Sequence, residues 1–177
     1  MNNFGERIRD LALEWATAQD LYAFAQRLIQ TPSLSTQEGD LAALLVTHLR
    51  ALGFDEVRVN AMGSVIVTLG HGDGPTLLFN AHMDTVAPGA PESWPYPPYE
   101  GTIADGALHG LGAVDMKGAL ASMVYGARQL LPFADRLQGR LVLAFVVQEE
   151  PCEGLAMRYI VEEEGLRPDF VVLGEPT

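Results

Sequence analysis

The pattern of hydrophobic and polar positions divides the chain into alternating helices and strands. Apolar residues recur at helical spacing from about Glu6 to Gln30, before the sequence Thr31-Pro32-Ser33, and again from Leu41 to Leu52, before Gly53. Proline interrupts a helix, and glycine readily adopts the left-handed conformation that follows a helix C-terminus. These stretches predict two or three helices at the start of the fold.

Short apolar and β-branched runs predict strands in the rest of the chain. They lie at residues 57–59, 65–67, 77–82, 141–147 and 170–173, with further helices expected at 115–131 and 154–164. Residues 86–101 hold five prolines and predict a long irregular loop. Strands that alternate with helices and are almost continuously apolar favour a three-layer α/β/α fold with a mostly parallel sheet. We expect a single domain over residues 1–177.

Composition narrows the possible functions. The net charge of −12 argues against a nucleic-acid partner, because phosphate binding depends on Lys and Arg. The single cysteine, Cys152, excludes an internal disulfide and fits a reducing compartment. The sequence contains no apolar run of about 18 residues and no pattern of a secretory signal. A protein without a membrane span, located in the cytoplasm, is therefore expected.

Acids and one histidine follow the ends of several predicted strands. In a parallel sheet these ends share one edge, where ligands of open α/β folds bind. Asp115 joins them because it opens a predicted helix directly after Gly110-Leu111-Gly112. The candidate site residues are His82, Asp84, Asp115, Glu149, Glu150 and Glu175.

Such a cluster of carboxylates is self-repelling in a cleft of low dielectric constant, and divalent cations relieve the repulsion. Imidazole with carboxylates suits Zn²⁺ and tolerates Co²⁺ or Mn²⁺. In the His-x-Asp pair the Asp84 carboxylate is expected to accept the second imidazole N–H of His82. Adjacent Glu149 and Glu150 point in different directions, so one can bind metal while the other acts as a general base.

Four segments together resemble the signature of the M20 metallopeptidase family. They are His82-Met83-Asp84-Thr85-Val86, residues 110–118 (GLGAVDMKG), Gln148-Glu149-Glu150 and Gly174-Glu175-Pro176-Thr177. That family includes acetylornithine deacetylase, succinyl-diaminopimelate desuccinylase, aminoacylase and glutamate carboxypeptidase. Residues 148–155 and 167–172 look closest to its selenium-metabolism-linked hydrolase branch.

The resemblance implies a zinc-exopeptidase-like fold and a site for two Zn²⁺ ions. Asp115 would bridge the ions, His82 and Glu175 would complete one site, and Glu150 would bind the other. Glu149 would be the base that takes a proton from the attacking water. The implied reaction is cleavage of an amide bond in an N-acyl amino acid or a short peptide.

The sequence departs from the family pattern in two places. Leu111 replaces an arginine that is usual in the glycine motif, and none of His48, His71 and His109 matches a late histidine that completes the Glu150 site. We therefore expect a truncated catalytic domain without its lid or dimerisation domain, able to self-associate through an exposed sheet edge. The alternative function is a non-catalytic remnant that binds metal or a partner chain. Nucleotide binding is disfavoured, because Asp115 stands where a dinucleotide fingerprint needs its third glycine.

Overall fold

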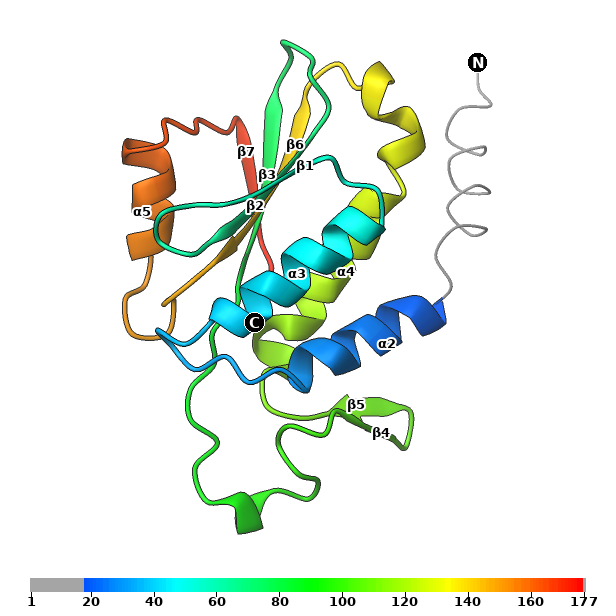
Figure 1. Cartoon of the computed structure of the whole chain (residues 1–177), viewed down its shortest axis with the longest axis vertical. Coiled ribbons are helices and arrows are strands. Elements are labelled where there is room, and N and C mark those ends of the chain that lie inside the picture. The colour runs from blue at the N-terminus through cyan, green and yellow to red at the C-terminus, as the bar shows by residue number, and fades with distance from the viewer. Residues whose placement is uncertain (1–17, 177) are drawn as a thin grey trace.

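The computed structural model describes residues 18–176. Within this part, five strands form the main sheet, and Figure 1 shows α3 and α4 on one face of it and α5 on the other. The strands of the main sheet are β1 (Glu56–Val59), β2 (Val65–Leu69), β3 (Thr76–His82), β6 (Arg140–Val146) and β7 (Phe170–Leu173). The expected three-layer α/β/α architecture is confirmed.

The sheet is mixed rather than mostly parallel. Its order is β1-β2-β6-β3-β7, with β3 parallel to both β6 and β7. By contrast, β2 is antiparallel to β1 and to β6. The parallel half is the half that matters for the site, because His82 pairs with Val146 there and the chain leaves β3 and β6 at the same edge.

The predicted helices are present, and one of them is clearly shorter at both ends than expected. They are α2 (Ala18–Ile29), α3 (Gly39–Ala51), α4 (Gly118–Arg128) and α5 (Leu155–Glu162). Residues 6–17 of the first predicted helix lie outside the described residues. The helix expected at 115–131 begins only at Gly118 and ends at Arg128, after which a short 3-10 segment, η3 (Leu131–Arg136), follows.

The loop between β3 and α4 contains structure that the sequence pattern does not reveal. A short 3-10 turn, η1 (Pro91–Ser93), lies in the proline-rich segment, and β4 (Thr102–Ala104) pairs antiparallel with β5 (Ala107–His109). Each of these strands has only three residues and is at most half-buried, so no apolar alternation marks them. The hairpin precedes the glycine motif and the segment η2 (Ala113–Lys117).

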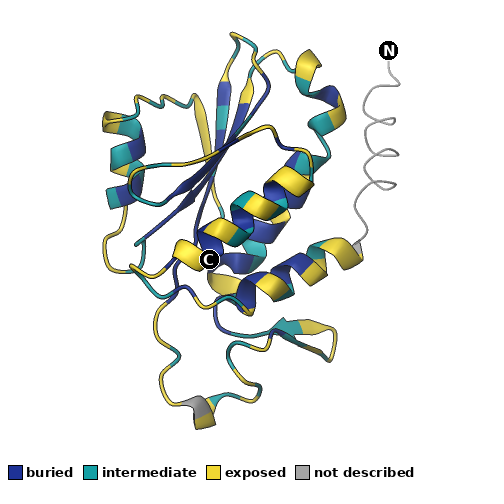
Figure 2. Cartoon of the chain, in the orientation of Figure 1, coloured by how far each residue is buried: buried dark blue, intermediate teal, exposed yellow. Residues whose placement is uncertain are grey.

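The core lies between the sheet and the helices on its two faces. Buried side chains of α3 and α4, such as Leu45 and Leu120, pack with those of β3 and β6, such as Leu78 and Phe145. Figure 2 shows this buried layer along the central strands, whereas the outer faces of the helices are exposed. Across residues 18–176, no helix combines the length and apolarity that crossing a membrane requires.

Candidate metal centre

The carboxyl ends of β3, β6 and β7 bring the predicted residues to one edge of the sheet. His82 is the last residue of β3, Glu149 and Glu150 follow β6, and Glu175 follows β7. Parallel pairing of β3 with β6 and β7 requires these three ends to lie side by side.

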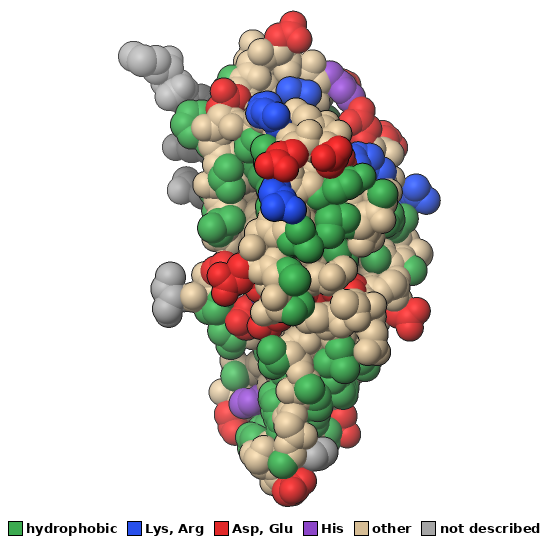
Figure 3. All heavy atoms as spheres, turned by 90° about the vertical axis from the view of Figure 1, so that its left-hand side faces the viewer, with side chains coloured by type: hydrophobic (Ala, Val, Ile, Leu, Met, Phe, Trp, Pro, Cys, Tyr) green, Lys and Arg blue, Asp and Glu red, His purple; other side chains and the backbone are tan. Residues whose placement is uncertain are grey.

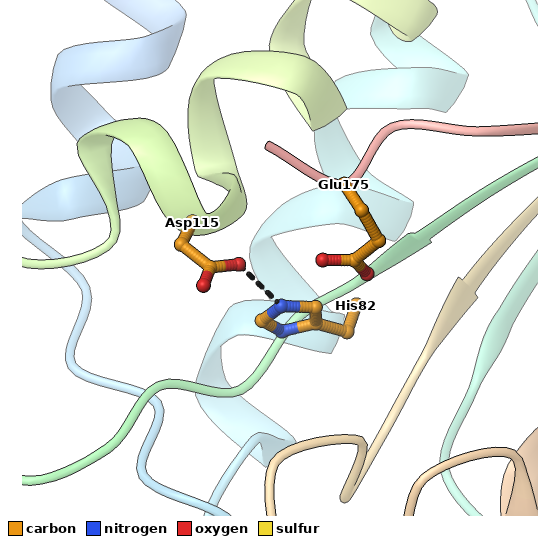
Figure 4. Close-up of side chains that lie close together, drawn as sticks. All are labelled: His82, Asp115 and Glu175. Atoms are coloured by element: carbon orange, nitrogen blue, oxygen red, sulfur yellow. Dashed lines mark hydrogen bonds and ion pairs between the residues drawn. The ribbon is translucent and has the colours of Figure 1, made fainter. Parts of the chain in front are cut away.

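Three of the predicted ligands form a compact group. The ligand atoms of His82, Asp115 and Glu175 all lie within 4.8 Å of one another, and Nε2 of His82 is 2.9 Å from Oδ1 of Asp115. Figure 4 shows the two carboxylates approaching the imidazole ring from different elements. Two ligands of one tetrahedral zinc ion lie about 3.3 Å apart, so small side-chain movements would let all three bind one ion. Among the described residues, this is the group with three such ligands.

His82 is held in a defined orientation by the main chain. Its ring is 1% exposed, and its Nδ1 lies 2.9 Å from the main-chain carbonyl oxygen of Asp84. A carbonyl oxygen only accepts hydrogen bonds, so Nδ1 carries a proton and Nε2 is left to face Asp115 and Glu175. This tautomer is the one that a metal-binding Nε2 requires.

The Asp84 carboxylate does not make the hydrogen bond that the sequence suggested. Its Oδ1 is 3.6 Å from Nδ1 of His82, beyond hydrogen-bonding distance, and the main-chain oxygen of the same residue takes that role. The carboxylate instead accepts the main-chain amides of Glu149 at 3.0 Å and Glu150 at 3.2 Å, and the hydroxyl of Ser35 at 2.7 Å. Burial raises the pKa of Asp84, but His82 and these donors outweigh it and leave the pKa below its ordinary value.

Glu149 and Glu150 lie in the loop after β6, and Glu149 reaches toward His82. Oε2 of Glu149 is 4.0 Å from Nε2 of His82, and its side chain is 29% exposed. Burial raises the pKa of both glutamates above the ordinary value, and His82 opposes the rise. The charges of Asp115 and Asp84 raise the pKa of Glu150 further.

Asp115 lies in an irregular turn and not at the start of a helix. Its φ of −119° and ψ of 93° are non-helical, and α4 begins three residues later. Gly112 has φ of 78°, and a Cβ there would lie 2.8 Å from Cγ2 of Thr85, so a side chain would block the approach of the turn to the His82 segment. Gly112 therefore lets the turn that carries Asp115 lie close to the segment that follows His82.

The residues at which the sequence departs from the family pattern lie in other environments. Leu111 is buried, and its amide donates to the carbonyl oxygen of Pro98 at 2.7 Å. His48 stacks on Phe24 with ring centroids 3.8 Å apart. His71 is 3.6 Å from a carboxylate oxygen of Glu56, and His109 lies 3.2 Å from the carbonyl oxygen of Ala104.

Sequence reasoning missed two buried charged residues beside the site. Glu38 is 5% exposed, and its carboxylate accepts the main-chain amides of Thr36 and Gln148. Lys117 is 1% exposed, and its ammonium donates to the carbonyl oxygens of Leu28 and Thr31. Glu38 lies at the start of α3, and Lys117 lies in the glycine motif. The sequence pattern of these segments does not indicate the distant main-chain groups to which the two side chains bind.

The donor set fits a divalent cation. One imidazole nitrogen and two carboxylates converge, and the two raised glutamate pKa values reflect unrelieved burial and repulsion between acids. The single lysine of the sequence, Lys117, turns its ammonium away to two carbonyls at the end of α2 and just after it. The three ligands could therefore hold a cation where they meet, and oxygen with imidazole ligands suits Zn²⁺, Mn²⁺ or Co²⁺.

Comparison with known proteins connects this geometry to a family. The model of peptidase family M20/M25/M40 matches residues 78–177, which is more than half of the chain. The chain is 37% identical over 159 residues to the uncharacterised protein YgeY of Escherichia coli K12. This match covers 89% of the chain and 39% of YgeY, so the chain spans about two fifths of the length of that relative.

Solved structures share the fold. Human carnosine dipeptidase 1 has a TM-score of 0.77 and 20% identity, over 94% of this chain and 40% of the dipeptidase. The M20 family metallo-carboxypeptidase Sso-CP2 of Sulfolobus solfataricus has a TM-score of 0.76 and 21% identity, over 89% of this chain and 37% of that enzyme. At this level of identity the likeness shows the architecture, and the family match comes from the sequence.

Proposed function

Because the chain belongs to peptidase family M20/M25/M40, we propose that it carries the metal centre of a hydrolase that cleaves an amide bond of an N-acyl amino acid or a short peptide. The observation that carries the proposal is the convergence of His82, Asp115 and Glu175 within 4.8 Å, with the free carboxylate of Glu149 4.0 Å from His82. Ligands and a candidate base thus meet at one point on the sheet edge.

The ligands divide between two proposed cation sites. His82, Glu175 and Asp115 would hold one ion, and Asp115 together with Glu150 would hold the other. We propose Zn²⁺ for both sites, with Co²⁺ or Mn²⁺ as substitutes. When bound, the two cations would lower the pKa of a water molecule and polarise the scissile carbonyl group.

Glu149 is the proposed general base. It follows β6 directly, its side chain is partly exposed, and its pKa is raised, first by burial and then by the charges of Glu175 and Glu150. A base is most effective when its pKa lies near the working pH, so a raised glutamate pKa suits the task. Glu149 would take a proton from the attacking water and deliver it to the leaving amine nitrogen. Asp84 would orient His82 through its carbonyl oxygen and the Glu149 loop through its carboxylate.

The test replaces the base and keeps the ligands. The wild-type chain and Glu149→Gln are loaded with Zn²⁺ and assayed on a panel of N-acetyl amino acids and dipeptides. We expect hydrolysis by the wild type, a loss of about 100-fold or more in the variant, and Zn²⁺ affinity within a few fold in calorimetry. Asp169→Asn, at the opposite end of the sheet, is the matched acid-to-amide control. It should leave hydrolysis and Zn²⁺ affinity unchanged. Equal turnover in wild type and Glu149→Gln would refute the role of Glu149.

A second function is favoured by one observation about Glu150. Among the described residues, the three-ligand group contains His82, Asp115 and Glu175 but not Glu150. A chain with one well-formed site would bind a single Zn²⁺ tightly and act as a metal-binding or partner-binding module without turnover. Calorimetric titration with Zn²⁺ separates the two functions. The binding module is supported if one site is tight, the other is weak or missing, and neither the wild type nor Glu149→Gln hydrolyses a substrate.

Self-association through the sheet edge stays a prediction. The strand β7 ends the sheet, and its residues Phe170 and Leu173 are 63% and 61% exposed. Figure 3 looks onto the side that carries α5 and shows exposed hydrophobic side chains there beside acidic ones. An apolar edge strand is a template for pairing with another chain. Light scattering of the purified chain over a range of concentrations tests this, and a concentration-independent monomer would contradict it.

The cytoplasmic location also stays a prediction.

A further inference from the structure

Three successive main-chain amides after β6 donate to two buried carboxylates. The amide of Gln148 lies 2.9 Å from Oε1 of Glu38, and the amides of Glu149 and Glu150 lie 3.0 Å and 3.2 Å from the two carboxylate oxygens of Asp84. Hydrogen bonds from amides to a carboxylate are about twice as strong as those between neutral groups. The backbone that carries Glu149 and Glu150 is therefore fixed by its hydrogen bonds to two negatively charged carboxylates.

Glu38 connects two turns that are distant in sequence. The same oxygen that accepts from Gln148 also accepts the amide of Thr36 at 3.0 Å. Thr36 has φ of 73° and Gln148 has φ of 56°, and non-glycine residues rarely adopt this left-handed conformation without support. The side chain of Glu38 is well placed to give that support, because the residue is 5% exposed and shielded from competing water.

The segment that contains Glu38 is also attached to the segment that contains Asp84. Ser33 donates its hydroxyl to the carbonyl oxygen of Met83 at 2.7 Å and accepts the amide of Thr85 at 2.9 Å. The hydroxyl of Ser35 donates to the Asp84 carboxylate at 2.7 Å. The two carboxylates therefore form one unit, which we call the carboxylate clamp and define as Glu38 with Asp84.

We propose that Glu38 is a positioning residue, which fixes the main chain at Gln148 and thereby aims the carboxylates of Glu149 and Glu150 at the metal centre. The roles of those two glutamates rest on the proposed function, whereas the contact of Glu38 with Gln148 does not. Glu38 touches neither the three-ligand group nor a substrate, so its effect passes through the backbone. An apolar residue at this position would leave two amides without their acceptor, at the start of the loop that carries the base.

The first experiment measures the contact itself. Amide hydrogen exchange is followed by NMR on the metal-free chain for the wild type, Glu38→Ala and Glu38→Gln. We expect exchange at Gln148 and Thr36 to be at least about tenfold faster in Glu38→Ala, because their acceptor is lost. Glu38→Gln keeps an acceptor oxygen without the charge and should lie between the other two.

Asp169→Ala is the matched control. Oδ2 of Asp169 accepts the amide of Thr76 at 2.7 Å, at the start of β3 and so at the opposite end from His82. This variant should speed exchange at Thr76 and leave Gln148 unchanged. If Glu38→Ala does not fold, Glu38→Gln alone decides: faster exchange at Gln148 supports the contact, and unchanged exchange overturns it.

The second experiment connects the contact to function. With Zn²⁺ bound, Glu38→Ala should lower kcat by about 10–100-fold, the usual range for groups that orient a metal site, with a smaller change in KM. It should also weaken the Zn²⁺ binding that depends on Glu150, whereas Asp169→Ala should change neither. Lost protection at Gln148 with wild-type metal binding and turnover would overturn the positioning role. A wild type that binds no Zn²⁺ would refute the proposed function instead, and the exchange data alone would then decide whether Glu38 holds the loop.

Discussion

Raising the pH should destabilise the metal-free chain through His82. Burial of this ring by itself lowers the imidazole pKa, but the contacts with Asp84 and Asp115 and the negative charges of Asp84 and Glu175 outweigh it and raise the pKa from 6.5 to about 9. The Nε2 atom faces Oδ1 of Asp115 at 2.9 Å, and the ring is 1% exposed, so the proton lies between a buried ring and a half-exposed carboxylate. A metal ion would replace this proton, and without metal the proton contributes to stability.

The sign and size follow from the two pKa values. The unfolded chain loses the His82 proton near pH 6.5, whereas the folded chain keeps it up to about pH 9. Stability from His82 is therefore fully present below pH 6.5 and is lost as the pH rises through 9. The complete loss is about 3 kcal/mol, from about 1.4 kcal/mol per pKa unit. Between pH 6.5 and pH 8 the expected loss is about 1.5 kcal/mol.

The pH range is chosen so that other groups do not mask the effect. Burial lowers the pKa of Lys117 to about 8, so that lysine adds stability only above pH 8. Burial, and then the charges of Arg27 and Arg128, lower the pKa of His48. The protonation of His48 therefore reduces the stability of the fold only at pH values below 6.5. Urea unfolding between pH 6.5 and 8 uses excess chelator and circular dichroism as the signal. The raised pKa values of Glu149 and Glu150 change stability in the same direction, so the part that belongs to His82 is the difference between the wild type and a His82 variant. The variant is His82→Gln, which should lose less stability than the wild type. A wild type whose stability stays flat, or falls no more than that of the variant, would refute the reasoning.

Three further predictions concern the site and its supports. Zn²⁺ binding near pH 7 should release about one proton from His82, measured by calorimetry in buffers of different ionisation enthalpy, and buffer-independent heats would contradict this. Lys117→Met keeps most of the side-chain volume but removes the donor to the carbonyl of Thr31, whereas the carbonyl of Leu28 still accepts the amide of Thr31, so urea unfolding should show a loss of about 1–3 kcal/mol, and an unchanged stability would count against it. Gly139→Ala should destabilise strongly in thermal unfolding, because its Cβ would lie 2.0 Å from a carbonyl oxygen, whereas Gly126→Ala, with no atom within 4 Å, should be neutral or slightly stabilising.

The elements with a regular apolar pattern could be predicted from sequence, and those held by distant partners could not. The apolar residues of α3 recur at helical spacing, and Gly53, with φ of 97°, follows its end. Both features predict the helix that the structure contains. The direction of β2 was not readable. Its side chains are almost all buried, so it resembles an interior parallel strand, yet it runs antiparallel to β6. Strand direction depends on pairing between distant segments, which an apolar run does not encode.

At the site, the sequence predicted which residues meet but not what each one does there. Strand ends located His82, Glu149 and Glu175, because parallel strands deliver their C-terminal residues to one edge. The same argument gave the wrong contact for Asp84, since spacing along a strand fixes the face of a side chain but not its hydrogen-bond partner. Its carboxylate accepts hydrogen bonds from two amides that lie 65 and 66 residues away in the sequence.

The partners of the acids divide them into two physical classes. Asp84 and Glu38 are almost completely buried and face main-chain amides, so their negative charge is compensated by the protein itself. Glu149 and Glu150 face other acids, and their pKa values are raised. An acid compensated by amides stays ionised without a cation, whereas acids that face one another need either protons or a cation. Sequence shows only that acids gather at the sheet edge. The hydrogen-bond partners show that Glu38 and Asp84 hold the backbone at this edge, whereas His82, Asp115 and Glu175 are the group that could hold an ion.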